Sequence, residues 1–246
     1  MIPIRDTIPS RHAPIATVSL IIINAVIFLL QSSMPFEYRE VLAYLFGLVP
    51  ARYTSPDWRA ALELMPTPWP FVTHMFLHGS FFHLFGNMWS LWLFGDNVED
   101  RMGSLRFLAF YLLCGLIAVL THMFLNPDST LPTVGASGAI AGVMGAYFTL
   151  FPRARLIMFF PVLFIPIFFE MSAFFYLGYW FLMEVIRGTA TLDVVEEVGG
   201  IAFWAHVGGF VAGFILYRFF LLSSREYRPW YPDEAIDDYP YRGFWR

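Results

Sequence analysis

The stretch VGASGAIAGVMGAYFTLF, residues 134–151, has no charged residue and is rich in small side chains. Gly138 and Gly142 lie four residues apart in it, so a helix formed here would present both glycines on one face. Later in the chain Gly209 and Gly213 repeat this spacing in another apolar stretch. Glycines at this spacing let helix backbones approach closely in lipid. The two stretches therefore predict a pair of membrane helices in close contact.

The composition supports a membrane environment for the rest of the chain. Of 246 residues, 58% are hydrophobic and only 14% are charged, whereas soluble domains are nearer 25% charged. Mean hydropathy is +0.59 and the net charge is −4. These values argue against a soluble globular enzyme, a disordered tail or a nucleic-acid-binding protein. The single cysteine, Cys114, excludes a disulfide framework within the chain.

Apolar stretches long enough to cross a bilayer recur along the chain, at about 20 residues each. We expect an all-α polytopic membrane protein with six spans. The fifth lies within a stretch too long for one straight helix, whose start we expect prolines to break. The expected spans are Ile15 to Gln31, about Phe76 to Gly95, Phe107 to Leu125, about Val134 to Phe151, a part of Leu156 to Ile186, and Val198 to Tyr217.

The arginines predict the orientation of these spans. With the N-terminus inside, eleven of the 15 arginines fall on the inner side, which satisfies the positive-inside rule and places both termini in the cytoplasm. The expected organisation is an N-terminus at 1–14, a membrane domain at 15–222 and a C-terminal tail at 223–246. The membrane domain includes a long outer loop at about 32–73, where we expect short interfacial helices.

Polar side chains on three spans are expected at one depth, near the outer face. His83 and Asn87 share a helix face of the second span, Ser137 lies near the outer end of the fourth, and His206 lies about two turns into the sixth. If the glycine faces meet, His206 comes within reach of Ser137 and can act as the base that a serine nucleophile needs. The amide of Ser137, at a helix start, and the side chains of His83 and Asn87 are then candidates for stabilising an oxyanion.

At these residues the sequence resembles the rhomboid family of intramembrane serine proteases, in its bacterial branch. The motifs that carry the resemblance occur in the family's order over about residues 1–225, and they are Gly135-Ala136-Ser137-Gly138, His83-x-x-x-Asn87, Ala205-His206-x-x-Gly209 and Glu99-Asp100-Arg101-Met102-Gly103.

The resemblance implies a six-helix bundle in a bacterial plasma membrane that cleaves transmembrane protein substrates by a Ser–His dyad without an aspartate. Carried over by position, Ser137 is the nucleophile, His206 is the base, and His83, Asn87 and the Ser137 amide form the oxyanion hole. The fifth span becomes a gate for the substrate helix. No metal, organic cofactor or nucleic-acid partner is implied, the lipid bilayer is the surrounding medium, and the oligomeric state stays open.

One departure from the family concerns the catalytic histidine. Many members carry an aromatic residue four positions after the serine, stacked on that histidine, and this chain has Ala141. Tyr147, Trp204 or a water molecule are the candidates for orienting His206. Glu184 and Glu170 are interpreted as carboxylates near the two ends of the fifth span, where they reach toward the interface.

The remaining histidines leave alternatives open. His74 and His78 are four apart, which also suits a metal on a helix, but we favour a supporting role beside the site, with Gly135 and Gly138. A transporter or metal-handling protein that uses these histidines and His83 is one rival interpretation. The other is a rhomboid-like protein that binds membrane clients without cutting them.

Overall fold

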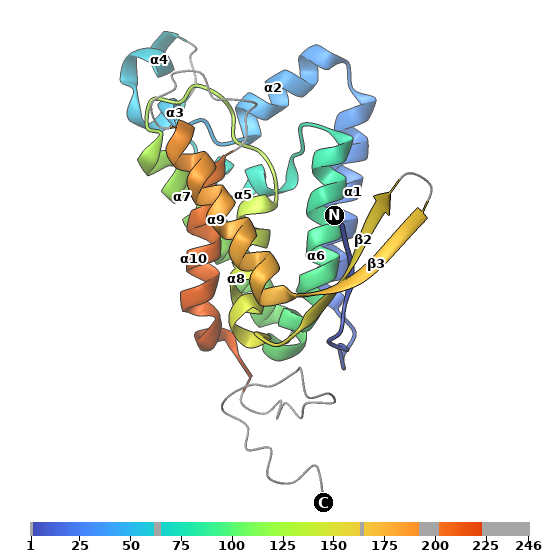
Figure 1. The fold of residues 1–246 in the computed structure, drawn as a ribbon. Helices are drawn as coiled ribbons and strands as arrows, with labels where there is room; N and C mark the ends of the chain where they lie inside the picture. The colour runs from blue at the N-terminus through green and yellow to red at the C-terminus, as the bar shows by residue number, and fades with distance from the viewer. Residues whose placement is uncertain (1, 62–64, 163–164, 192–201, 223–246) are drawn as a thin grey trace, which may run out of the picture.

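A computed structural model describes residues 2–61, 65–162, 165–191 and 202–222. The long helices stand side by side as a bundle, and the described chain begins at a small sheet beside it (Figure 1). The long helices are α1 (Ile15–Ser33), α6 (Phe81–Met102), α7 (Ser104–Leu125), α8 (Ser137–Leu150), α9 (Ala173–Thr191) and α10 (Phe203–Phe220). The predicted tail at 223–246 lies outside the described residues.

Three of these helices, α1, α7 and α10, are long and apolar enough to cross a membrane by length and composition, and α8 is a shorter apolar helix. The protein is therefore a multi-pass integral membrane protein with a helical fold. The count of six spans and the orientation of the termini stay predictions.

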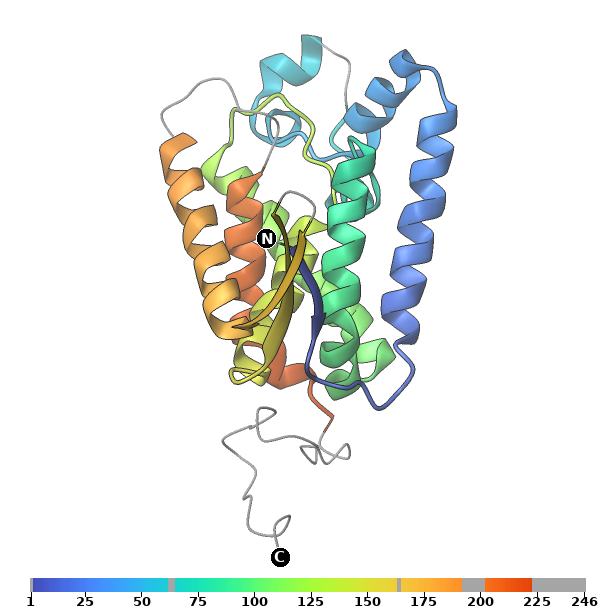
Figure 2. The same ribbon diagram turned by 45° about the vertical axis from the view of Figure 1, so that its right-hand side comes forward.

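The loop between α1 and α6 folds into short helices, as the sequence predicted. They gather at the end of the bundle where α1 ends (Figure 2). Arg52 is almost fully buried there, and its guanidinium donates hydrogen bonds to the carbonyl oxygens of Tyr44 at 2.8 Å and Leu45 at 3.3 Å, near the end of α2. The short helices are α2 (Phe36–Phe46), α3 (Ala51–Thr54), α4 (Pro56–Ala61), α5 (Pro70–Thr73) and the 3-10 turn η1 (His74–Phe76).

Helix α6 begins later than the sequence suggested. Ser80 has an extended backbone, and its hydroxyl accepts the amide N–H of His83 at 3.2 Å, which is an N-cap contact. Neither His74 nor His78 therefore lies in α6, although the expected second span, from about Phe76, included His78. His74 begins η1, and His78 lies in the connection between η1 and α6.

The stretch between α8 and α9 holds a β-hairpin that the sequence analysis did not predict. Strands β2 (Arg155–Val162) and β3 (Ile165–Ser172) pair antiparallel with Pro161 opposite Pro166, and β1 (Ile2–Asp6) pairs antiparallel with β2. The sheet lies outside the bundle, to the right of α6 in Figure 1 and in front of the helices in Figure 2. The two prolines thus face each other on paired strands, and the helix starts only at Ala173.

Helix α8 is the centre of the bundle and packs on α6, α7, α9 and α10. At the glycines, the backbone of α8 lies directly against the backbone of α10. A Cβ atom built on Gly209 would overlap the carbonyl oxygen of Gly138, and one on Gly213 would overlap that of Gly142. The predicted meeting of the two glycine faces is confirmed.

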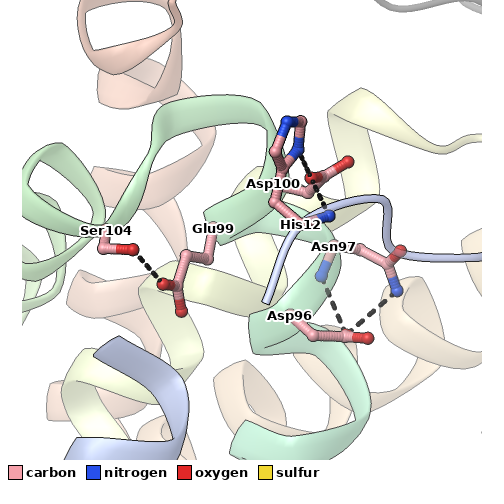
Figure 3. Close-up of polar contacts among 6 residues, drawn as sticks. All are labelled: His12, Asp96, Asn97, Glu99, Asp100 and Ser104. Carbon is pink, nitrogen blue, oxygen red and sulfur yellow. Dashed lines mark hydrogen bonds and ion pairs between the residues drawn. The ribbon is translucent and has the colours of Figure 1, made fainter. Parts of the chain in front are cut away.

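A carboxylate joins three helices at the opposite end of the bundle. Glu99, near the end of α6, accepts the amide N–H groups of Ala16 at 2.9 Å and Thr17 at 2.8 Å, at the start of α1. It also accepts the hydroxyl of Ser104, the first residue of α7, at 2.6 Å (Figure 3). A negative charge is favourable where helices begin, so buried Glu99 stabilises both starts.

Candidate active site

Ser137 is the first residue of α8 and lies against α10. The Nε2 atom of His206, on α10, is 2.8 Å from the Ser137 hydroxyl oxygen. The backbones of α8 and α10 are in contact at Gly138 and Gly209, close to Ser137 and His206. The two side chains can therefore reach each other although both are short. The expected approach of Ser137 and His206 is therefore observed.

The backbone before Ser137 passes close to two of the candidate oxyanion residues. Gly135 has a φ angle of +126°, which residues with a side chain rarely adopt. Its amide N–H donates to the carbonyl oxygen of His74 at 2.8 Å. A Cβ atom on Gly135 would lie 2.7 Å from His83 Nε2 and 3.5 Å from Asn87 Nδ2. The imidazole and the amide thus converge on the segment that carries Ser137.

His78 orients one of these groups. The Asn87 side-chain amide donates to His78 Nε2 at 3.0 Å, and the rings of His78 and His83 meet edge-on with centroids 5.1 Å apart. Since an NH2 group has two hydrogens, Asn87 retains one for another acceptor. His78 therefore contacts the side chain of Asn87, and its supporting role stays a prediction.

His74 holds the connection that carries Gly135. Its Nδ1 atom donates to the carbonyl oxygen of Pro70 at 2.7 Å, and its own carbonyl accepts from Gly135. Burial lowers the pKa of His74 from its ordinary 6.5 to about 4, so the ring is neutral at pH 7.

The amide N–H of Ser137 is available to a ligand. At the first residue of a helix it has no intrahelical carbonyl partner, and no other hydrogen bond from it is found among the described residues. The described ranges also contain no group of three His, Cys, Asp or Glu side chains arranged to hold a metal ion. A metal site formed by His74 and His78 would need both histidines on one face of a helix, and the two do not share a helix.

The residue that contacts the other side of His206 was not among the candidates. The carboxylate oxygen Oε2 of Glu184, on α9, is 2.6 Å from His206 Nδ1. Glu184 lies in the interior of α9 with 4% of its surface exposed, so the interpretation that it reaches toward the interface was wrong. A carboxylate within an apolar membrane stretch was the signal that could have identified it.

The other candidates for orienting His206 are engaged elsewhere. Tyr147 lies ten residues beyond Ser137, about 15 Å along α8, and its hydroxyl donates to Asp6 at 2.6 Å. The indole N–H of Trp204 donates to the carbonyl oxygen of Gly188 at 3.1 Å.

Comparison with known proteins places this arrangement in a family. The Rhomboid domain profile matches residues 66–223, which include the whole site, and the chain therefore belongs to the Rhomboid domain family. Rhomboid protein 1, mitochondrial, of Saccharomyces cerevisiae is 31% identical over 158 residues, which are 61% of this chain and 41% of that protein.

Two further relatives match over shorter stretches. Presenilin-associated rhomboid-like protein A, mitochondrial, of Danio rerio is 32% identical over 150 residues, 58% of this chain and 35% of its own length. RHOMBOID-like protein 5 of Arabidopsis thaliana is 37% identical over 78 residues, 32% of this chain and 25% of its own length. The matches thus cover well under half of each relative. Two of the three names state a mitochondrial location, which gives no support to the bacterial branch and plasma membrane expected from the sequence.

Proposed function

We propose that this chain is an intramembrane serine endopeptidase that cleaves transmembrane segments of other proteins, with Ser137 as nucleophile and His206 as general base. The observation that carries the proposal is the 2.8 Å contact between the Ser137 hydroxyl and His206 Nε2. Membership of the Rhomboid domain family, whose members are typically intramembrane proteases, supports the same reaction class.

The reaction proceeds through an acyl-enzyme. The Ser137 oxygen attacks the carbonyl carbon of the substrate's peptide bond while its proton passes to His206 Nε2. The tetrahedral intermediate collapses, the C–N bond breaks, and the leaving amine takes the proton from His206. Water, deprotonated by the same imidazole, then hydrolyses the ester and frees Ser137.

The negative oxygen of the tetrahedral intermediate is stabilised by donors around Gly135. The Ser137 amide, the imidazole of His83 and the remaining amide hydrogen of Asn87 are the donors in this proposal. Each such donor contributes about 10²–10³ in rate, because it is already oriented when the charge develops. The proximity of Gly135 to both side chains supports this assignment.

The proposed orientation of the protein in the membrane follows from the distribution of its arginines. Six spans place both termini on one side. Ser137 is the first residue of α8, and the segment before it contacts η1, which follows the short helices α2–α5. In Figure 1 these short helices gather at the end of the bundle away from the C-terminus. A substrate helix would therefore be cut near the surface at that end, with water reaching the site from the same side.

The test needs no knowledge of the natural substrate. The purified protein is treated with an alkyl fluorophosphonate, and the adduct is mapped by mass spectrometry. We expect labelling at Ser137 that is lost in Ser137→Ala and His206→Ala, since loss of either group typically costs about 10⁶ in kcat. Ser104→Ala, which removes a hydroxyl at the far end of the bundle, is the matched control and keeps the label.

Substrate cleavage separates the proposal from the non-cutting alternative. A single-span reporter protein reconstituted with the enzyme in liposomes should be cleaved by the wild type and by Ser104→Ala, and not by Ser137→Ala. Processing that persists in Ser137→Ala would refute the proposal. A folded wild type that neither labels nor cleaves would favour a client-binding protein.

A further inference from the structure

Glu184, Ser137 and His206 form a continuous chain of side chains from three helices. The imidazole of His206 lies between the other two, with Glu184 Oε2 2.6 Å from Nδ1 and the Ser137 hydroxyl 2.8 Å from Nε2. Figure 1 shows α9, α8 and α10, which carry them, packed beside one another. Both nitrogens of the ring are therefore engaged, one by a carboxylate and the other by the candidate nucleophile.

The carboxylate determines which ring nitrogen carries the proton. An ionised carboxylate only accepts hydrogen bonds, so with Glu184 ionised the hydrogen in the 2.6 Å contact belongs to His206 Nδ1. The neutral ring then has its lone pair on Nε2, directed at the Ser137 hydroxyl. Without Glu184 the opposite tautomer becomes accessible, and in that tautomer Nε2 carries a hydrogen and cannot take the serine proton.

The same contact favours the charged state that forms during the reaction. When His206 takes the serine proton it becomes an imidazolium, and an adjacent negative charge stabilises it strongly where water is scarce. Glu184 is 4% exposed, so this charge is screened little by solvent.

The surroundings of Glu184 hold the carboxylate in place. Its second oxygen, Oε1, is 3.8 Å from the guanidinium of Arg187, one turn further along α9. The ring of Trp180, one turn earlier on α9, lies 5.9 Å from the His206 ring. A buried carboxylate is costly unless it is paired, and here its partners are His206 and Arg187.

We propose that Glu184 is a positioning residue for His206, so that the chain uses a Ser–His–Glu arrangement in place of the Ser–His dyad that the family resemblance implies. This inference rests on the proposed function. Glu184 replaces, from a different helix, the orienting contact that other members draw from an aromatic residue at the position of Ala141.

The kinetics of fluorophosphonate labelling test this role. In that reaction the Ser137 oxygen bonds to phosphorus, fluoride leaves, and the serine proton passes to His206. In Glu184→Gln we expect the maximal labelling rate to fall by at least about 10²-fold, given that an amide at the equivalent place of a Ser–His–Asp triad costs about 10⁴ in kcat. The probe concentration for half-maximal rate should stay within about twofold, because Glu184 does not touch the probe.

Glu170→Gln is the matched control. Glu170 lies on β3, half-exposed, and pairs with Arg155 at 3.0 Å, so the same chemical change there should leave labelling unchanged.

A second measurement uses protein with ¹⁵N-labelled histidine. A proton in a short imidazole–carboxylate hydrogen bond resonates far downfield of the amide region. His12 Nδ1 makes a second contact of this kind, 2.5 Å from Asp100 Oδ1, so the signal of His206 is identified as the one that disappears in Glu184→Gln and persists in Ser137→Ala and in Asp100→Asn.

The outcomes separate the two proposals. Wild-type labelling kinetics in Glu184→Gln, alongside an inactive Ser137→Ala, would overturn the role of Glu184 and leave the proposed function standing. Full labelling or cleavage in His206→Ala would overturn both. If Glu184→Gln unfolds at a much lower temperature than the wild type, the downfield signal that Asp100→Asn retains decides, and its absence would reject the contact between Glu184 and His206.

Discussion

Replacing Gly209 by alanine tests the backbone contact between α8 and α10. The added methyl group would lie 3.0 Å from the carbonyl carbon of Gly138 and still closer to its oxygen, whereas ordinary contact begins at 3.4 Å. Because the obstacle is backbone, no side chain can rotate away, and α10 has to retreat by roughly 1 Å.

The retreat has two expected effects. Overpacking of a tight contact costs about 1–3 kcal/mol, and the better helix propensity of alanine returns up to about 1 kcal/mol, so we expect the free energy of unfolding to fall by about 2 kcal/mol. His206, three residues before Gly209, moves with the helix. A shift of this size takes the 2.8 Å contact with Ser137 beyond hydrogen-bonding distance and should lower the labelling rate about 10²-fold.

Unfolding of the purified protein in mixed micelles, followed by circular dichroism, measures the first effect, and fluorophosphonate labelling measures the second. The matched control is Gly86→Ala on α6, where a Cβ atom meets nothing within 4 Å. That variant should be as stable as the wild type or more stable by up to about 1 kcal/mol. A Gly209→Ala protein with the stability and labelling rate of Gly86→Ala would show that the two backbones are not in contact.

Two further predictions concern groups away from the nucleophile. The pKa of His74 is about 4 in the fold and 6.5 when unfolded, so its contribution to the free energy of unfolding is complete above pH 6.5 and is lost as the pH falls toward 4, by up to about 3 kcal/mol. His74→Asn should lose less stability than the wild type between pH 7 and pH 4.5 in the same unfolding assay, and equal losses would contradict the assignment. Glu99→Gln should lower the free energy of unfolding by about 1–2 kcal/mol, since a neutral amide accepts the N–H groups of Ala16 and Thr17 less strongly. The exposed Glu170→Gln should change it by less than about 0.5 kcal/mol, and a similar change in both variants would rule out the proposed role of Glu99.

The sequence was sufficient to predict the meeting of Ser137 and His206. Both residues flank glycines at helical spacing, and a helix face of small residues in lipid has few ways to pack other than against a matching face. The position of His83 and Asn87 on one face of α6 followed from the same periodicity.

The sequence was not sufficient to predict the contact of Glu184 with His206 or the β-hairpin before α9. The contact of Glu184 with His206 joins positions 22 residues apart on two helices, and no local pattern fixes how those helices are rotated about their axes. Strands β2 and β3 are as apolar as the neighbouring helices, so hydropathy could not distinguish them from a span. The delayed start of α6 depends on the extended backbone of Ser80, which composition does not reveal.

Helix α10 is anchored to the neighbouring helices just beyond its last residue. At the end remote from His206, Arg106 donates to the carbonyl oxygen of Leu221 at 2.8 Å, and the amide of Leu222 donates to the carbonyl oxygen of Arg101 at 3.1 Å. Between these anchors and His206, the backbone contacts of Gly209 and Gly213 with α8 leave no layer of side chains that could absorb a displacement. A displacement at Arg101, which is itself buried, would therefore be carried about 20 Å along the axis of α10 toward Ser137 and His206.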